Sequence, residues 1–337
     1  MKAVLVRQFG PFAEAKVEEV ADPQPKTHDV IVAVEAIETN YPDVLIMEGR
    51  YQMKPPFPFI PGKGVAGRVL ALGSGVTDLA IGQRVAVQLE HGAFAERICA
   101  DRSWCYPVPE GMDAGTAAAG VLTYQTAWFA LTDRAQIKPG DSVLVLGAGG
   151  GVGIAALQLA KALGAGTVIA GTRGTAKADL VRQAGADHVV DLAADDLRNS
   201  LRAEIHKLTD GRGVDIIIDP VGGAIFEPAL RALAWRGRLV VVGFTGGDIP
   251  QVRINYLLLR NIAVVGVHGS DYRDRWPEES ARAQAAIFDF IQQGVFTPEI
   301  SARFPLSRFA DALELLSNGQ ARGKILLIPE TASGEVA

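Results

Sequence analysis

The chain has 337 residues, and because domains average roughly 150 residues, two domains are expected. Hydrophobic residues make up 48% of the sequence and charged residues 21%, a composition that can bury a sizeable core and is not that of a disordered chain. The formal net charge is −5 and no basic tract stands out, which argues against nucleic acid as the main partner.

Targeting signals are not evident in the sequence. No apolar run approaches the roughly 20 residues of a membrane span, and the apolar part of the N-terminus is too short for a signal peptide. The two cysteines, Cys99 and Cys105, exclude a disulfide framework. We therefore expect a cytoplasmic protein that has no membrane partner.

The first hundred or so residues are predicted to form β-structure joined by loops rich in proline and glycine. Short apolar runs predict strands over 1–6, 30–34, 67–72 and 84–87. The intervening segment 55–62 contains four prolines and is predicted to be a stiff, extended loop.

From about Asp113, segments of helical periodicity alternate with short β-branched runs. This alternation is typical of a doubly wound parallel sheet with helices on both faces. The helices are predicted over 115–131, 154–163, 176–184, 197–208 and 226–234, and the strands over 142–146, 167–170, 188–190, 214–218, 238–242 and 262–267. The tail adds amphipathic helices over 281–293 and 307–318 and a strand over 324–328.

A glycine loop, Gly-Ala-Gly-Gly-Gly-Val-Gly at 147–153, joins one of these strands to the next helix. A strict GxGxxG that begins at Gly147 fails, and two other spacings fit instead, Ala148-x-Gly150-x-x-Gly153 and Gly147-x-x-Gly150-x-x-Gly153. Glycines at such a turn let the backbone approach a pyrophosphate, which the helix N-terminus attracts. We predict that Gly150, Gly151 and Val152 bind a dinucleotide, although the loop can also be read as a plain tight turn.

The end of the following strand predicts which dinucleotide binds. An NAD site needs an acidic residue there for the ribose 2′-OH, and this segment has none. It offers Thr172, Arg173 and Lys177, which suit the 2′-phosphate of NADPH. The alternative is that Arg173 and Lys177 are ordinary surface charges.

Two further strand ends carry glycines, at 219–223 and 243–247. Such ends line the ligand crevice of a doubly wound sheet, so Gly222, Gly243 and Phe244 are predicted to contact the cofactor. These glycines can also be read as simple strand terminators.

A family resemblance is carried by several segments: 1–4, 40–43, 48–51, 58–62, 92–96, 122–127, the glycine loop with Gln158 and Lys161, 219–222 and 323–324. Taken together, these segments resemble the medium-chain dehydrogenase/reductase superfamily, in its zinc-independent, zeta-crystallin-like quinone oxidoreductase family. The resemblance covers nearly the whole chain. It implies an α/β protein with a GroES-like, β-rich catalytic domain over 1–115, completed by 268–337, and a Rossmann NADP-binding domain over 116–267. It also implies a homodimer or homotetramer.

Zinc is not expected in either of its usual roles. A catalytic site needs about three protein ligands and a structural site four. Zinc-dependent relatives place a cysteine where this chain has Asn40, and Gly-His-Glu where it has Gly62-Lys63-Gly64. Lys63 is a cation and a poor ligand, and two cysteines cannot make a four-cysteine site. The Lewis acid of the alcohol dehydrogenases is therefore predicted to be absent.

The resemblance also implies which side chains take part in the chemistry. It places Asn40 and Asp43 near the nicotinamide and the substrate, although Asn-Tyr-Pro-Asp is also a plausible turn or helix start. Tyr51 matches a tyrosine of related reductases, with packing as the alternative. Lys63 departs from the family: it could bind an anionic substrate, pair with Asp43 or be solvated.

The same resemblance assigns further residues to the cofactor. Thr123 matches a threonine that faces the nicotinamide and its phosphates, and Val267, His268 and Gly269 match a segment that contacts the nicotinamide amide. Lys324 completes the cofactor set through the Gly-Lys match. Leu45 stands where the family commonly has a tyrosine, and this departure leaves the substrate preference open.

Without zinc, the acceptor must already be electrophilic, so the leading hypothesis is an NADPH-dependent quinone oxidoreductase. A reductase of enone, enal or enoyl thioester double bonds is the first alternative. A non-enzymatic NADPH-binding protein of the crystallin or RNA-binding type is the second, and a zinc-dependent alcohol dehydrogenase is the third.

Overall fold

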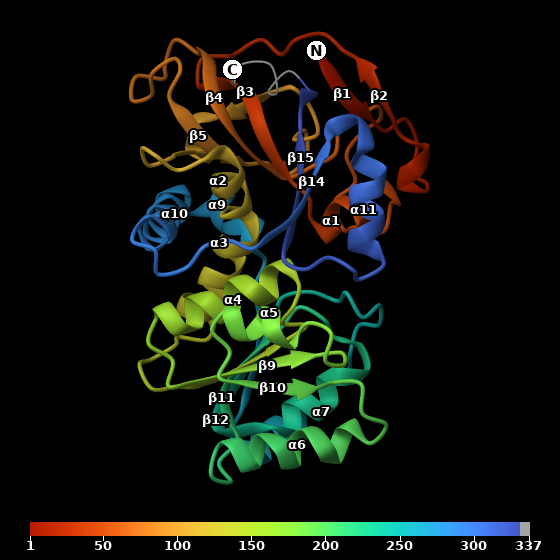
Figure 1. Cartoon of the computed structure of the whole chain (residues 1–337), viewed down its shortest axis with the longest axis vertical. Helices are drawn as coiled ribbons and strands as arrows, with labels where there is room; N and C mark the ends of the chain where they lie inside the picture. The colour runs from red at the N-terminus through yellow and green to blue at the C-terminus, as the bar shows by residue number, and fades with distance from the viewer. Residues whose placement is uncertain (331–337) are drawn as a thin grey trace. The chain divides into compact units, whose positions relative to one another are not determined.

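The computed structural model describes residues 1–330, which fall into two compact units. Among these residues, the first unit comprises 1–122 and 270–330, and the second is Thr123–Gly269 (Figure 1). The predicted limit at residue 115 cuts through α2 (Ala114–Ala119), whereas in the structure the whole of this helix packs on the β-sheet of the first unit. No helix of residues 1–330 is both long and apolar enough to cross a membrane.

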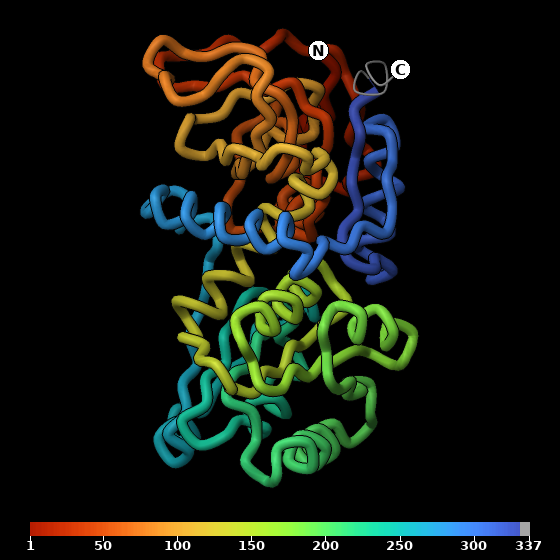
Figure 2. The backbone as a smooth tube through the Cα atoms, turned by 60° about the vertical axis from the view of Figure 1, so that its left-hand side comes forward, coloured from red at the N-terminus to blue at the C-terminus, as the bar shows by residue number. Residues whose placement is uncertain are grey.

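The first unit is built on a seven-stranded sheet whose main path has the order β14-β15-β3-β4-β5-β7, with β6 also paired to β3. A separate hairpin, β1 (Lys2–Leu5) and β2 (Lys16–Glu19), precedes it. Strand β15 pairs with β3 and strand β14 with β15, so the C-terminal part of the chain joins the sheet of the N-terminal part (Figure 2). The strands of the sheet are β3 (Asp29–Glu38), β4 (Gly64–Leu72), β5 (Arg84–Gln88), β6 (Arg97–Asp101), β7 (Cys105–Pro107), β14 (Ile300–Pro305) and β15 (Lys324–Ile328).

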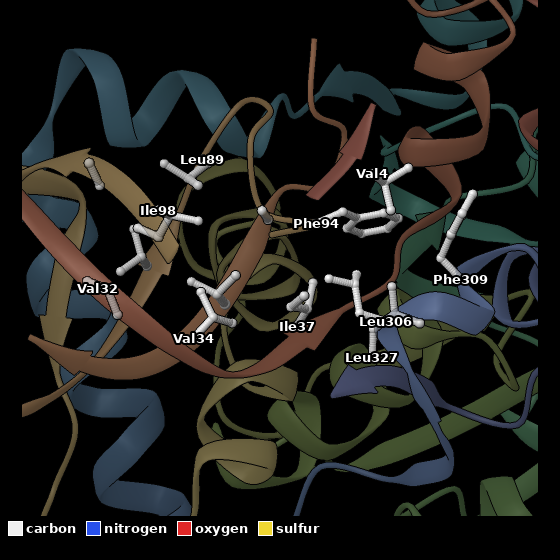
Figure 3. Packing of buried hydrophobic residues seen from close by; sticks show 14 of the residues in the cluster. Val4, Val32, Val34, Ile37, Leu89, Phe94, Ile98, Leu306, Phe309 and Leu327 are labelled. Carbon is white, nitrogen blue, oxygen red and sulfur yellow. The ribbon is translucent and has the colours of Figure 1, made fainter. Parts of the chain in front are cut away.

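The core of this unit gathers alternate residues of the strands together with one face of α11 (Phe309–Ser317). Figure 3 shows the cluster, which includes Val4, Val34, Phe94 and Phe309. Such alternation follows from the two-residue period of a β-strand. The remaining helices of this unit are α1 (Tyr41–Met47), α2, α9 (Gly269–Arg275), which begins at the last residue of the second unit, and α10 (Pro277–Gln292).

A bulge in β3 reverses this alternation near the end of the strand. The pairing with β4 shifts register between Val34 and Ala36. Val34 therefore faces the main core, whereas Ala36 faces α2 and packs with Ala66 and Ala86 of the neighbouring strands. Small side chains in this row let α2 lie close to the sheet. The same face continues to Glu38, the last residue of β3.

The second unit is a six-stranded, fully parallel sheet of order β10-β9-β8-β11-β12-β13. It is the predicted doubly wound sheet. The strands are β8 (Ser142–Leu146), β9 (Thr167–Thr172), β10 (His188–Asp191), β11 (Val214–Asp219), β12 (Leu233–Val241) and β13 (Ala263–Gly266). The helices are α3 (Leu122–Phe129), which begins at the last residue of the first unit's N-terminal segment, α4 (Gly151–Ala162), α5 (Ala178–Gln183), α6 (Leu197–Leu208), α7 (Phe226–Arg231) and α8 (Ile254–Arg260).

One predicted helix is wrong in its extent. The segment 115–131 is not continuous, because α2 ends at Gly120 and α3 starts at Leu122, followed by a π-helical turn over Ala130–Arg134. An alanine-rich stretch has helical propensity throughout, so propensity does not reveal this break. The helix that follows the glycine loop begins at Gly151, three residues before the predicted start at 154.

Candidate active site

The glycine loop lies at the carboxyl end of β8, where the strand passes into α4. Gly147 has a φ of +58°, which favours glycine, and Gly150 stands at the N-cap position of α4 without any side-chain cap. The first N–H groups of an uncapped helix have no partner in the helix. They are therefore open to an anion, and they belong to Gly151 and Val152 among others.

Gly153 shows why a side chain is not tolerated in this loop. A Cβ at this position would lie 2.5 Å from the carbonyl oxygen of Gly147 and 2.6 Å from the Cα of Ala148. Both atoms belong to the backbone and cannot move aside cheaply. The first turn of α4 thus packs directly on the loop, which makes a cradle for the pyrophosphate of a dinucleotide.

The residues predicted to bind the 2′-phosphate of NADPH lie at the end of β9 and just after it. Thr172 is buried and its hydroxyl donates to the carbonyl oxygen of Gly174 (2.9 Å), while Arg173 is exposed. The side chain of Lys177 lies across the glycine loop, because a Cβ on Gly149 would be 2.5 Å from its Cδ. The structure therefore brings Lys177 to the loop. Asp191 accepts the Gly174 N–H (2.8 Å), and this hydrogen bond holds the turn that follows β9.

The sheet order places β11 next to β8, so the chain reverses its winding between these strands. This is the switch point at which doubly wound sheets bind ligands. Asp219 ends β11 there, and one of its oxygens accepts the N–H groups of Val221 (2.9 Å) and Gly222 (2.8 Å). Burial raises the pKa of this carboxyl. Gly222 has a φ of +64° and packs against the ring of Phe244.

The other predicted cofactor residues of this unit lie at the ends of its elements. Thr123 is buried in the first turn of α3. The segment from Val267 to Gly269 follows β13, and the Val267 N–H donates to the carbonyl oxygen of Val241 (3.0 Å). His268 is exposed. The contacts of these residues with a cofactor stay a prediction, as does that of Gly243 beside the switch point.

In the first unit, Asn40 and Asp43 form the start of α1. The Asn40 N–H donates to Asp43 Oδ2 (2.7 Å), which closes the first turn in the manner of a capping box. The alternative of a helix start is therefore confirmed as the local structure. Asp43 is nevertheless fully buried, and burial raises the pKa of its carboxyl to about 7, against the opposing hydrogen bond from Asn40 and the charge of Lys63.

One interpretation of the sequence was that the Lys63 side chain is exposed to solvent. In the structure this side chain is buried, so that interpretation was wrong. The Lys63 side chain is 1% exposed, and its Nζ lies 2.5 Å from Glu90 Oε1 and 4.9 Å from the ring centroid of Tyr51. The ammonium thus pairs with Glu90 and not with Asp43. Burial raises the pKa of the Tyr51 hydroxyl.

A second buried cation shares the Glu90 carboxylate with Lys63. Arg273 is 2% exposed and lies 3.7 Å from Glu90 Oε2, with its guanidinium 4.6 Å from the ring centroid of Trp104. It also pairs with Asp274 (2.7 Å). Sequence reasoning missed Arg273 and Glu90, because neither belongs to a recognisable motif.

Lys324 is buried in a set of protein contacts. Its Nζ lies 2.6 Å from Glu38 Oε2 and donates to Asn40 Oδ1 (2.6 Å) and to the carbonyl oxygen of Thr39 (3.1 Å). Lys324, which is predicted to contact the cofactor, thus also forms an ion pair with Glu38 that was not predicted from the sequence. Glu38 was missed because it ends an apolar strand and belongs to no motif that marks a buried carboxylate.

Comparison with known proteins agrees with this architecture. Residues 26–110 match the family model described as alcohol dehydrogenase GroES-like domain, and residues 151–285 match the one described as zinc-binding dehydrogenase. A GroES-like domain joined to a doubly wound nucleotide-binding sheet defines the class of medium-chain dehydrogenases and reductases.

Related proteins identify the family to which the chain belongs within this class. The chain is 36% identical over 311 residues to quinone oxidoreductase-like protein 2 of Mus musculus, covering 92% of this chain and 88% of the relative. It is 30% identical over 347 residues to the human synaptic vesicle membrane protein VAT-1 homolog, covering 98% of this chain and 86% of that protein. The chain therefore belongs to the quinone oxidoreductase family of the medium-chain dehydrogenase/reductase superfamily.

Solved structures give the same result. Mycobacterial Rv1454c in complex with NADPH superposes with a TM-score of 0.90 at 31% identity, over 98% of this chain and 100% of that one. Escherichia coli quinone oxidoreductase in complex with NADPH also gives 0.90, at 28% identity and the same coverage of both chains.

One of the two matching family models is described as a zinc-binding dehydrogenase, but the side chains of the residues that the structure describes do not form a zinc site. Within residues 1–330, no group of three or more His, Cys, Asp or Glu side chains is placed to hold a metal ion. Asn40 accepts from Lys324, and Lys63 contributes an ammonium that already pairs with Glu90. This donor set does not fit a catalytic zinc ion, which needs about three protein ligands.

Proposed function

We propose that this protein is an NADPH-dependent oxidoreductase that reduces a quinone without zinc. The observation that carries the proposal is the uncapped glycine loop at the start of α4, with Lys177 lying across it and Arg173 exposed beside it. The loop suits a pyrophosphate, and the two cations suit a 2′-phosphate. The NADPH complexes of two relatives support the same cofactor.

When bound, NADPH supplies a hydride from its nicotinamide ring. The residues of this chain bind and orient. The N–H groups of Gly151 and Val152 hold the pyrophosphate, and Thr172, Arg173 and Lys177 select the 2′-phosphate. Further cofactor contacts are assigned to Thr123, Gly150, Gly222, Gly243, Phe244, Val267, His268, Gly269 and Lys324.

The acceptor side is assigned to Asn40, Asp43, Tyr51 and Lys63. Amide, hydroxyl and ammonium groups can donate hydrogen bonds to the oxyanion that develops as a carbonyl acceptor is reduced. Asp43 can hold or release a proton near neutral pH, because burial raises the pKa of its carboxyl to about 7. With no Lewis acid in this role, the acceptor must be electrophilic in itself, as a quinone is.

Steady-state assays with NADPH and a panel of quinones, enones, enals and enoyl thioesters test the proposal. We expect quinones to give the highest kcat/KM. Turnover of enones or enoyl thioesters alone would favour a double-bond reductase, and NADPH binding without any turnover would favour a non-enzymatic role. Oxidation of an alcohol together with stoichiometric zinc in metal analysis would refute the zinc-free mechanism.

A homodimer or homotetramer is part of the proposal, and the second unit carries features that support it. Ile254, Leu258 and Leu259 of α8 are each more than 70% exposed, and Trp235 of β12 is 65% exposed. The neighbouring β13 is an edge strand of the sheet. Apolar side chains beside an open edge favour pairing with another copy. Light scattering should give a dimer or larger species, and Leu258→Glu should shift the protein toward monomer.

A further inference from the structure

Glu38 occupies a row of residues that crosses three strands of the first unit. It pairs with Gly64 of β4, which in turn pairs with Gln88 of β5. Residues paired directly across strands point to the same face of a sheet. This face is the one that α2 covers, one row beyond Ala36, Ala66 and Ala86. Glu38 is therefore a carboxylate on the face that carries this row of alanines, and it is 0% exposed.

Gly64 makes room for this carboxylate. A Cβ at position 64 would lie 2.1 Å from Glu38 Oε1 and 2.9 Å from its Cδ. Gly64 sits in an ordinary β-strand and has no positive φ, so its backbone conformation is open to any residue. What the position requires is the absence of a side chain, and the volume that a side chain would take is filled by Glu38.

The carboxylate contacts two parts of the chain directly and a third through Lys324, and each of the three carries or adjoins a predicted site residue. One oxygen lies 2.6 Å from Lys324 Nζ, and the other accepts the N–H of Leu122 (3.2 Å), the first residue of α3. Lys324 in turn donates to Asn40 Oδ1 (2.6 Å), and this hydrogen bond connects Glu38 indirectly to Asn40. Glu38 thus links β15, the Asn40 turn and the start of α3, where Thr123 is the next residue.

A simple stabilising ion pair does not account for this arrangement. Burying two charges costs desolvation that their attraction barely offsets, and apolar side chains of equal volume are often as stable. Burial indeed raises the pKa of the Glu38 carboxyl, against the effects of Lys324, Leu122 and Asn40. The carboxylate is better explained by the groups that it holds in place.

We propose that Glu38 is a positioning residue, which keeps Lys324, Asn40 and the first turn of α3 in their working geometry, and that Gly64 is required to admit its carboxylate. This inference rests on the proposed function, since it concerns the geometry of the same site. It extends that function by two residues that are not among the predicted site residues.

The test is a set of variants compared by kcat, KM for the acceptor, NADPH binding and melting temperature. Glu38→Gln removes the charge, and Gly64→Ala displaces the carboxylate while leaving Glu38 unchanged. We expect each to lower kcat by about tenfold or more, since small displacements of catalytic groups cost that much. Glu35→Gln is the matched control, because Glu35 lies on the same strand and pairs with the partly exposed Arg84 (2.7 Å). It should retain full kcat.

Two double variants separate positioning from a general loss of fold. With Glu38→Ala, the added methyl of Gly64→Ala has room, so the double variant should be no worse than Glu38→Ala alone. Glu38→Ala with Gly64→Asp returns a carboxylate to the same space and should recover at least part of the lost kcat. A structural role alone would change the melting temperature without this rescue.

The outcomes distinguish the two proposals. If the wild-type protein reduces quinones with NADPH while Glu38→Gln and Gly64→Ala keep its kcat, the positioning role is refuted and the proposed function stands. The same holds if kcat falls only in step with the melting temperature and Gly64→Asp brings no recovery. A wild-type protein that neither binds NADPH nor reduces any acceptor overturns both.

Discussion

Asp43 offers a direct test of how burial governs the site, through the variant Asp43→Asn. Its carboxyl is fully buried, and burial raises its pKa from 3.8 to about 7. The amide of the variant is nearly isosteric and keeps an oxygen to accept the Asn40 N–H, which is 2.7 Å from Asp43 Oδ2. It has no proton to release, so the comparison isolates the ionisation.

The sign of the effect follows from proton linkage. Between pH 3.8 and about 7, the folded protein keeps a proton on Asp43 that the unfolded chain has already released. The wild type therefore loses stability as the pH rises through this window, and above it the loss is complete. At about 1.4 kcal/mol for each unit of pKa difference, the whole loss is on the order of 4 kcal/mol, of which roughly 3 kcal/mol falls between about pH 5 and pH 8.

Urea unfolding of both proteins across this pH range measures the effect. The two units need not unfold together. Pulsed hydrogen exchange, measured on peptides from β3 and α1, therefore identifies the unfolding transition of the first unit. Relative to the wild type, Asp43→Asn should gain roughly 3 kcal/mol between about pH 5 and pH 8, which is about 1 M or more in urea midpoint. Asp179→Asn, on the exposed face of α5, is the control. A difference between Asp43→Asn and wild type that does not change with pH would refute the reasoning.

Three further outcomes follow from the contacts described above. Gly153→Ala should weaken NADPH binding by about tenfold or more in a fluorescence titration, because its Cβ would meet the Gly147 carbonyl at 2.5 Å, and unchanged binding would contradict the cradle. Arg173→Glu should raise the Kd for NADPH by about 10- to 100-fold and leave that for NADH nearly unchanged, and an equal loss for both would show that Arg173 does not read the 2′-phosphate. Glu90→Gln should destabilise the protein by about 3 kcal/mol or more and exceed the loss from Lys63→Met, because it leaves two buried cations without their shared carboxylate. The reverse order in thermal denaturation would show that Glu90 is not their common counter-charge.

The fold was predictable because its main signals are local. Each β-branched run followed by a helical period specifies a strand and a helix, and parallel strands joined in this way form a doubly wound sheet. The glycine loop was predictable for the same reason, since the Gly147–Gly150–Gly153 spacing and the strand before it are both visible in one short stretch. The break at Gly120 was not, because alanine-rich helix propensity continues across it.

What only the tertiary structure decided is the environment of the charged residues. The sequence by itself determined that Lys63 and Lys324 are cations near family motifs, but not that each is buried against a carboxylate from elsewhere in the chain. By a two-residue period Glu38 is in phase with Val32 and Val34 and would face the main core. The bulge after Val34 turns it toward α2 instead, where the missing side chain of Gly64 admits its carboxylate. A charge buried by distant segments has no periodic or local pattern, because its cost and its partners arise only when those segments pack together.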